Sequence, residues 1–181
     1  MLSRRHDRVV WADADVLVLD PKALADHVCS VRGHGFAREL FLRVSADGSA
    51  QPQWGVNNAL MVFDHSDPVH AAYLQACLHR LRQLPDGEVP RTAMGPDLLH
   101  EIARGRRLQF IEGVGLFTPA MLDELVNGDG ALLRHYRALS RVPLAAANLC
   151  HFMRNATAPS QRPAFDRVYE AAVAQLIGVV A

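Results

Sequence analysis

The chain has 181 residues, half of them apolar, and its 19 basic residues balance 19 acidic ones, so the net charge is zero. This length fits one ordinary domain. The composition excludes a disordered charged tail and a domain-wide basic surface for nucleic acid, so we expect no nucleic-acid partner. No run approaches the roughly 18 apolar residues of a membrane span, and the charged start lacks the pattern of a signal peptide.

The three cysteines are odd in number, far apart and without CxxC spacing: Cys29, Cys77 and Cys150. This usage predicts buried thiols in a reducing compartment and excludes a disulfide framework. We therefore expect a cytoplasmic globular protein.

The first third of the chain has strand-like patterns. Two short apolar runs lie between Arg8 and Leu19, on either side of Asp13-Ala14-Asp15, and such runs favour buried strands. A helix is expected from Pro21, with Asp20 as its N-cap. After a break at Gly33-His34-Gly35, strands are predicted at residues 39–44, 51–54 and 59–63.

The remainder alternates helical and extended patterns. Helices are expected where apolar residues recur at helical spacing between recognisable start and stop signals, at residues 66–85, 95–105, 118–127, 132–139 and 165–176. A strand is predicted at 108–111 and a linker at 155–163. This order predicts an α/β fold with a mixed sheet flanked by helices. Residues 1–155 would form the main region, and 156–181 a linker and a C-terminal docking helix.

The strongest chemical signal is the pair Asp13 and Asp15 in apolar surroundings. On an extended strand, residues two apart face the same side, with Cα atoms about 6.5 Å apart. Two carboxylates placed in this way require a compensating cation, and their oxygens suit Mg²⁺ or Mn²⁺ shared with a substrate phosphate. The sequence therefore predicts a metal–phosphate site at the end of a core strand. The alternative is a simple turn after a strand.

Two enzyme classes use such a motif. Asp13-Ala14-Asp15-Val16-Leu17 resembles the DxDx(T/V) motif of haloacid dehalogenase-type phosphohydrolases, in which the first aspartate is the nucleophile. Leu17 stands where that class has Thr or Val. The only lysine, Lys22, comes too early for the later cation of that class, and no adjacent acidic pair is present. This reaction stays as an alternative.

The second class matches more of the chain. Four segments in order resemble the DXD-containing sugar transferases of family GT32, which act in bacterial polysaccharide synthesis: residues 11–17, 54–58, 92–99 and 147–152. The resemblance extends from about Val9 to about Asn155. It implies a GT-A-like fold, present here in incomplete form, and a metal-dependent hexosyltransferase that uses a nucleotide-sugar donor and a glycan acceptor.

The resemblance also implies roles for individual residues. Asp13, Asp15 and His151 would hold Mn²⁺ or Mg²⁺, and Asp97 would contact a sugar as the catalytic candidate. The implied substrate-binding residues are Trp54, Asn57, Asn58, Gly95 and Pro96. Each also has an ordinary structural interpretation, such as a hairpin aromatic, turn-forming asparagines, a helix start or a structural histidine.

The chain also departs from the family. Members begin with a base-binding βαβ segment of roughly a hundred residues, whereas residues 1–8 precede the first strand here. An alternative is therefore an inactive or truncated remnant that binds a partner. A sheet without those first strands would expose an apolar edge, which predicts a homodimer through that edge.

Overall fold

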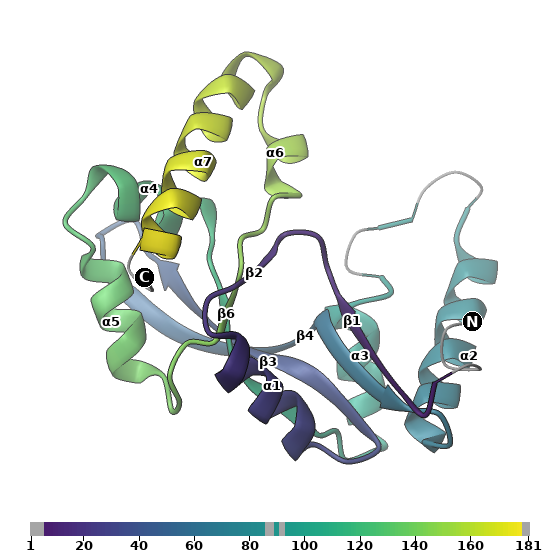
Figure 1. Cartoon of the computed structure of the whole chain (residues 1–181). Helices are drawn as coiled ribbons and strands as arrows, with labels where there is room; N and C mark the ends of the chain where they lie inside the picture. Colours follow the sequence, from purple (N-terminus) through teal and green to yellow (C-terminus); the bar gives the residue numbers. More distant parts are fainter. Residues whose placement is uncertain (1–5, 86–88, 91–92, 179–181) are drawn as a thin grey trace. The chain divides into compact units, whose positions relative to one another are not determined.

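A mixed six-stranded sheet with the order β1-β4-β3-β5-β6-β2 forms the centre of the computed structural model, which describes residues 6–85, 89–90 and 93–178 (Figure 1). The strands are β1 (Arg8–Ala12), β2 (Val16–Val18), β3 (His34–Val44), β4 (Ala50–Asp64), β5 (Phe110–Leu116) and β6 (Ala146–Asn148). β1 pairs antiparallel with β4, and β2 pairs antiparallel with β6, whereas β5 and β6 are parallel. The expected α/β class, with a mixed sheet flanked by helices, is confirmed.

The helices begin and end close to their sequence signals. They are α1 (Pro21–Ser30), α2 (Pro68–Gln83), α3 (Pro96–Ala103), α4 (Pro119–Asn127), α5 (Ala131–Leu139), α6 (Met153–Ala156) and α7 (Arg162–Gly178). Asp67 caps α2 by accepting the Val69 N–H, and Thr118 caps α4 by accepting the Met121 N–H. The side chain of Asp20 accepts the Ala23 N–H, as expected for the N-cap of α1.

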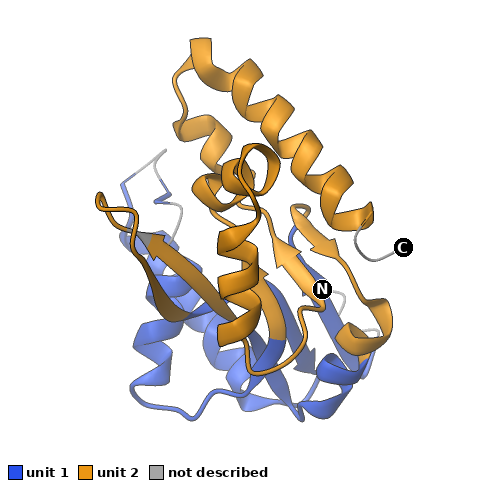
Figure 2. Cartoon of the chain, turned by 90° about the vertical axis from the view of Figure 1, so that its left-hand side faces the viewer, with its two compact units in different colours: residues 1–13, 26–38, 55–112 blue, residues 14–25, 39–54, 113–181 orange. Residues whose placement is uncertain are grey.

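The chain divides into two compact units, which are coloured separately in Figure 2. Unit 1 comprises residues 1–13, 26–38 and 55–112, and unit 2 comprises residues 14–25, 39–54 and 113–181. The core of unit 1 packs apolar residues of β3 and β4 against α2 and α3. Its buried members are Phe36, Val56, Met61, Phe63, Val69, Tyr73, Leu98, Leu99 and Leu108.

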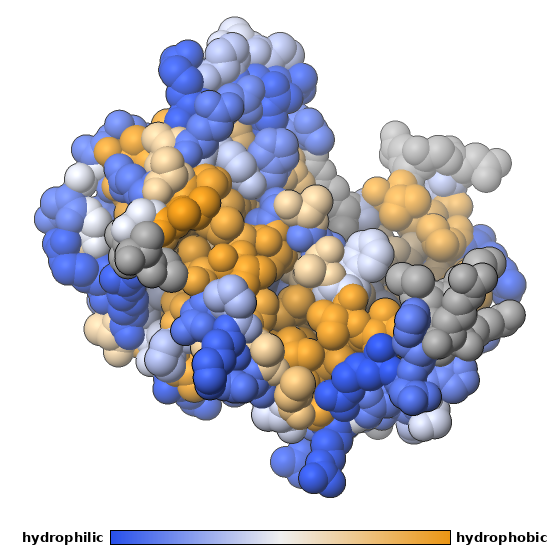
Figure 3. Space-filling view, in the orientation of Figure 1, coloured by the Kyte–Doolittle hydropathy of each residue, from blue (hydrophilic) through white to orange (hydrophobic). Residues whose placement is uncertain are grey.

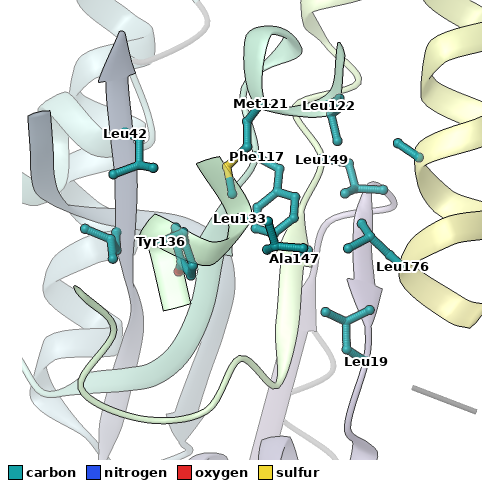
Figure 4. Close-up of a cluster of buried hydrophobic side chains, with 12 residues drawn as sticks. Leu19, Leu42, Phe117, Met121, Leu122, Leu133, Tyr136, Ala147, Leu149 and Leu176 are labelled. Carbon is teal, nitrogen blue, oxygen red and sulfur yellow. The ribbon is translucent and has the colours of Figure 1, made fainter. Parts of the chain in front are cut away.

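Unit 2 has its own core, drawn in Figure 4. Phe117 and Tyr136 meet edge to face with ring centroids 5.7 Å apart, and both are almost fully buried. Leu122 from α4 and Leu176 from α7 belong to the same cluster, and α7 packs against α4. In Figure 3, hydrophilic residues cover the upper end of α7, whereas hydrophobic residues are exposed toward its C-terminal end, where Ile177 is 52% exposed.

Several strand predictions need correction. The predicted strands 51–54 and 59–63 are parts of one continuous strand, β4, and β5 begins at Phe110, two residues later than predicted. The expected break at 33–35 is wrong for His34 and Gly35, which belong to β3. The chain turns at Gly33, whose φ of +79° suits glycine.

Two features were not predicted from the sequence: strand β6, and the regular structure found within the expected linker. Ala146–Asn148 is too short to give an alternating pattern, and it forms a strand because β5 and β2 pair with it on either side. The expected linker at 155–163 contains the end of α6, a 3₁₀ turn at Pro159–Gln161 and the start of α7.

Burial also differs from expectation. β1 is an edge strand, and Val10 and Trp11 are 48% and 54% exposed, so this apolar run is not a buried core strand. Of the three cysteines, only Cys150 is buried, and all three are free thiols. Among the described residues, no helix has the length and apolar character that crossing a membrane requires. The predicted stop at Asp86-Gly87 and the motif residue Thr92 lie outside the described residues, as does Met1–Arg5.

Candidate functional site

Asp13 belongs to unit 1 and follows the last residue of β1. Its N–H donates to the Ala59 carbonyl at 2.8 Å, and its carboxylate accepts the Trp11 indole N–H at 2.7 Å. The next two residues, Ala14 and Asp15, form a turn. The alternation expected of an extended strand therefore does not hold across the pair, and the metal–phosphate motif is not at the end of a core strand.

Unit 1 brings three of the predicted residues into one neighbourhood. Asp13 is bonded to Ala59, the neighbour of Asn58 on β4, and Asn58 lies against Gly95 at the start of α3. A Cβ on Gly95 would come within 2.4 Å of the Asn58 amide oxygen, so any larger residue at this position would have to displace the Asn58 side chain.

The Tyr73 hydroxyl holds the loop that precedes α3 by donating to the Met94 carbonyl at 2.6 Å. Burial, chiefly, raises the pKa of Tyr73 well above its ordinary value, and the negative charge of Asp13 adds to the shift. The phenol therefore stays neutral and serves as a fixed donor beneath the Gly95 loop.

The other predicted residues of unit 1 have local roles. The Asn57 side-chain oxygen accepts the Ala59 N–H at 3.0 Å, which is the local turn-like bond that asparagine favours. Pro96 is the first residue of α3, and Asp97 lies exposed in the first turn. The hydrogen bond with Glu101, chiefly, raises the pKa of Arg80, and the charge of Asp97 adds to the shift, so the Asp97 carboxylate lies near the α2 guanidinium.

In unit 2, Asp15 and His151 are neighbours although 136 positions separate them. The Asp15 carboxylate accepts the backbone N–H of His151 at 2.9 Å, and the Asp15 carbonyl accepts the backbone N–H of Leu149 at 3.0 Å. These two bonds tie the turn before β2 to the segment after β6. The sequence resemblance placed both residues in one site, and the tertiary fold of unit 2 brings them together.

An open hollow of about 480 Å³ lies at this contact, lined by Ala14, Asp15, His151, Phe152 and Tyr169. The His151 ring meets the Tyr169 ring edge to face, with centroids 4.8 Å apart. Burial raises the pKa of the Tyr169 phenol, and the charge of Asp15 raises it further. The hollow therefore combines a carboxylate, an imidazole and two aromatic rings, a combination suited to a polar ligand with a flat or C–H-bearing face.

A buried polar network lies beside the hollow, and the sequence analysis missed it. Glu39 on β3 and Asn148 on β6 are 1% and 4% exposed, and the Asn148 amide donates to the Glu39 carboxylate at 2.9 Å. The Asn148 side-chain oxygen accepts the Cys150 N–H at 3.2 Å. The signal in the sequence was a glutamate inside the mostly apolar segment 36–42, where a buried charge is costly unless it has a partner.

The network constrains the residue before His151. Cys150 has a φ of +51°, the only positive φ of a non-glycine residue in the described part of the chain. Such a conformation costs of the order of 1 kcal/mol or more and persists only where the surroundings enforce it. Burial, with the nearby charges of Glu39 and Asp15, raises the pKa of the Cys150 thiol to about 12. The Cys150 thiol therefore stays neutral. The left-handed backbone at Cys150 directs the backbone N–H of His151 toward Asp15.

The lining of this hollow contains two residues of a type that can ligate a metal ion. Within the described ranges, no group of three or more His, Cys, Asp or Glu side chains is placed to hold an ion. Asp15 and His151 both line the hollow. Mg²⁺ and similar ions often take only one or two protein carboxylates and complete their shell with phosphate oxygens and water, so a pair fits an ion that arrives with a diphosphate.

Trp54, the last predicted residue, lies elsewhere in unit 2. Its ring is 38% exposed, and the Arg141 guanidinium lies over it, 5.6 Å from the ring centroid. The residue is therefore a cation–π platform for Arg141. It does not line the hollow beside Asp15.

Comparison with known proteins adds no family to this geometry. No family model matches the chain, and neither a curated protein nor a solved structure shows significant similarity to it. The functional conclusion therefore depends on the residues themselves.

Proposed function

We propose that this chain is the catalytic region of a metal-dependent glycosyltransferase of GT-A type, which transfers a sugar from a nucleotide-sugar donor to a glycan acceptor. The observation that carries the proposal is an open hollow lined by Asp15, His151 and two aromatic side chains, in which the His151 backbone N–H donates to the Asp15 carboxylate at 2.9 Å. The apposition of Asn58 and Gly95 in unit 1 also supports it, because the same family resemblance pointed to both residues.

In this mechanism, Asp15 and His151 would be the residues that hold a divalent ion, because both line the hollow. A bound Mn²⁺ or Mg²⁺ supplies Lewis acidity that stabilises the charge on the departing nucleoside diphosphate. A mixed carboxylate and imidazole pair favours a transition ion, so we expect Mn²⁺ to be preferred over Mg²⁺. The role of Asp13 stays a sequence-based proposal of metal or ribose binding, and Asp97 stays a proposed contact to a sugar hydroxyl.

The surrounding residues orient the pair. The backbone N–H of His151 fixes one carboxylate oxygen of Asp15. Tyr169 and Phe165 pack edge to face against the imidazole and restrict its rotation. Phe152, 47% exposed at the mouth of the hollow, offers an apolar surface to the C–H face of a sugar.

Isothermal titration of the full chain with UDP and with GDP, each with and without Mn²⁺, tests the proposal. We expect Mn²⁺-dependent binding to one nucleotide, and we expect Asp15→Asn to weaken it by about 10–100-fold or more, since mutation of a group that only supports a metal ligand already costs about that much in metal affinity. Asp129→Asn is the matched control, because Asp129 is an exposed aspartate of unit 2 paired with Arg134. Failure of the folded wild-type chain to bind either nucleotide, or equal binding by Asp15→Asn, would overturn the proposal. The former result would favour the partner-binding remnant.

A further inference from the structure

A second hollow in unit 2, of about 510 Å³, lies apart from the residues used above. Its lining includes Leu19, Asp20, Arg137, Arg141 and Leu144. Asp15 lines the first hollow and precedes the three residues of β2, and Leu19 lines the second and follows them, so the Cα atoms of these two residues are about 13 Å apart at roughly 3.3 Å per strand residue. No residue is shared between the two linings.

The lining of this hollow includes two cationic side chains, Arg137 and Arg141. Arg137 lies in the last turn of α5, and Arg141 follows four positions later. Within the described part of the chain, Arg137 has no hydrogen bond or ion pair, whereas Trp54 supports the guanidinium of Arg141 from below. Guanidinium groups recognise carboxylate and phosphate through paired N–H donors, so two of them in one wall favour an anionic group.

The remaining walls favour hydroxyls and C–H groups. Asp20 contributes a carboxylate, one oxygen of which accepts the Ala23 N–H at the start of α1. A carboxylate accepts hydrogen bonds from hydroxyls but repels an anion, so Asp20 and the arginines select different parts of one ligand. Leu19 and Leu144 supply an apolar floor. A volume of this size accommodates a monosaccharide or a somewhat larger molecule.

We propose that this hollow binds a sugar that carries one anionic group, a carboxylate or a phosphate. The anionic group meets Arg137 and Arg141, the hydroxyls donate to Asp20, and the C–H face rests on the leucines. This inference does not depend on the proposed transferase activity, because it uses none of the residues beside Asp15.

Titration of the ¹⁵N-labelled full chain by NMR tests the inference with four probes: glucuronate, glucose 6-phosphate, glucose and inorganic phosphate. We expect saturable shifts of the Asp20, Ser140 and Leu144 amides with at least one of the two acidic sugars. Affinity should be at least about tenfold higher than for glucose or inorganic phosphate, since only the acidic sugars engage both sides of the hollow. Glucuronate and glucose 6-phosphate separate the carboxylate from the phosphate.

Variants locate the binding. Arg137→Gln should lower the affinity for the acidic sugar by about tenfold, and the Arg137→Gln/Arg141→Gln double variant further. Arg134→Gln, one turn earlier on α5 and paired with Asp129, should leave it unchanged. Arg137→Gln alone removes a side chain without a described partner, so it tests the site even where the double variant fails to fold. Equal binding of inorganic phosphate, unchanged affinity in Arg137→Gln, or shifts confined to residues 150–152 would overturn the inference. Mn²⁺ and nucleotides are absent from these titrations, so the result is separate from the transferase test.

Discussion

At the scale of single residues, the buried pair of Glu39 and Asn148 is the most consequential feature that the structure adds. A carboxylate that is 1% exposed is stable only with hydrogen-bond donors around it, and Asn148 is one of them. The same asparagine accepts the Cys150 N–H and so supports the left-handed corner before His151. One amide thus connects the stability of unit 2 to the geometry of the hollow beside Asp15.

Asn148→Ala should therefore destabilise the protein by about 1–3 kcal/mol, the cost of removing a hydrogen-bond partner from a buried polar group. Urea unfolding followed by circular dichroism measures this change. Asn127→Ala is the control, because Asn127 is exposed at the end of α4 and donates only to the exposed Asp123. A change in the free energy of unfolding no larger than that of Asn127→Ala would contradict the role assigned to the network.

At the scale of elements, the edge strand β1 is held by side chains as well as by its pairing with β4. The Arg8 guanidinium forms two bonds with the Asp64 carboxylate, at 2.6 and 3.0 Å, and donates to the Val28 and Val31 carbonyls. The hydrogen bond from Arg8 is the main reason that the pKa of Asp64 lies below its ordinary value, and the hydrogen bond from the Gly33 N–H lowers this pKa further. The ion pair therefore connects the start of β1, the end of β4 and the chain around α1.

This pair predicts the direction of an acid effect. The folded pKa of Asp64 is depressed, so its contribution to stability is fully present above the unfolded value of about 3.9 and is lost as pH falls through the lower folded value. The contribution is about 0.2–1 kcal/mol, because both side chains are one-third exposed. Asp64→Asn should flatten the fall of the free energy of unfolding between about pH 5 and pH 2. Urea unfolding at several pH values measures it, with Asp123→Asn as the exposed control. An unchanged acid profile in Asp64→Asn would contradict the assignment.

At the scale of the whole molecule, each unit has its own buried cluster, and the predicted site residues are divided between them. Asp13, Asn58 and Gly95 belong to unit 1, whereas Asp15 and His151 belong to unit 2. The core of unit 2 supports the second group, because β6 leads from the buried Ala146 to His151, and α7 carries both Leu176 into the core and Tyr169 into the hollow. Packing of α7 against α4 therefore helps to place Tyr169 in the wall of the hollow.

Leu122→Ala on α4 should cost about 2–5 kcal/mol, the range for emptying a fully buried leucine site. Leu122 is 1% exposed and lies in the cluster that includes Leu176. Ile177→Ala on α7 is the matched control, since Ile177 is 52% exposed and its loss should change the free energy of unfolding by about 0.5 kcal/mol or less. Chemical unfolding of both variants decides the matter, and equal effects would contradict the assignment of Leu122 to the core.

Much of the helical architecture was predictable because its signals are local. Asp67 and Thr118 are the N-caps of helices that the sequence predicts to begin at these residues, and the apolar residues at helical spacing lie within those helices. The strands were predicted less well. Continuous β4, the short β6 and the exposure of β1 all depend on which strand lies alongside, and such neighbours are distant in the sequence.

Of the candidate site, the sequence by itself determined which chemical groups are available: carboxylates at Asp13 and Asp15 and an imidazole at His151. Only the tertiary structure decided that Asp15 meets His151, that a turn replaces the expected strand at Ala14, and that Glu39 is buried beneath the corner at Cys150. The physical reason is that burial and hydrogen bonding depend on partners from remote segments, whereas residue type and helical periodicity are properties of the local chain.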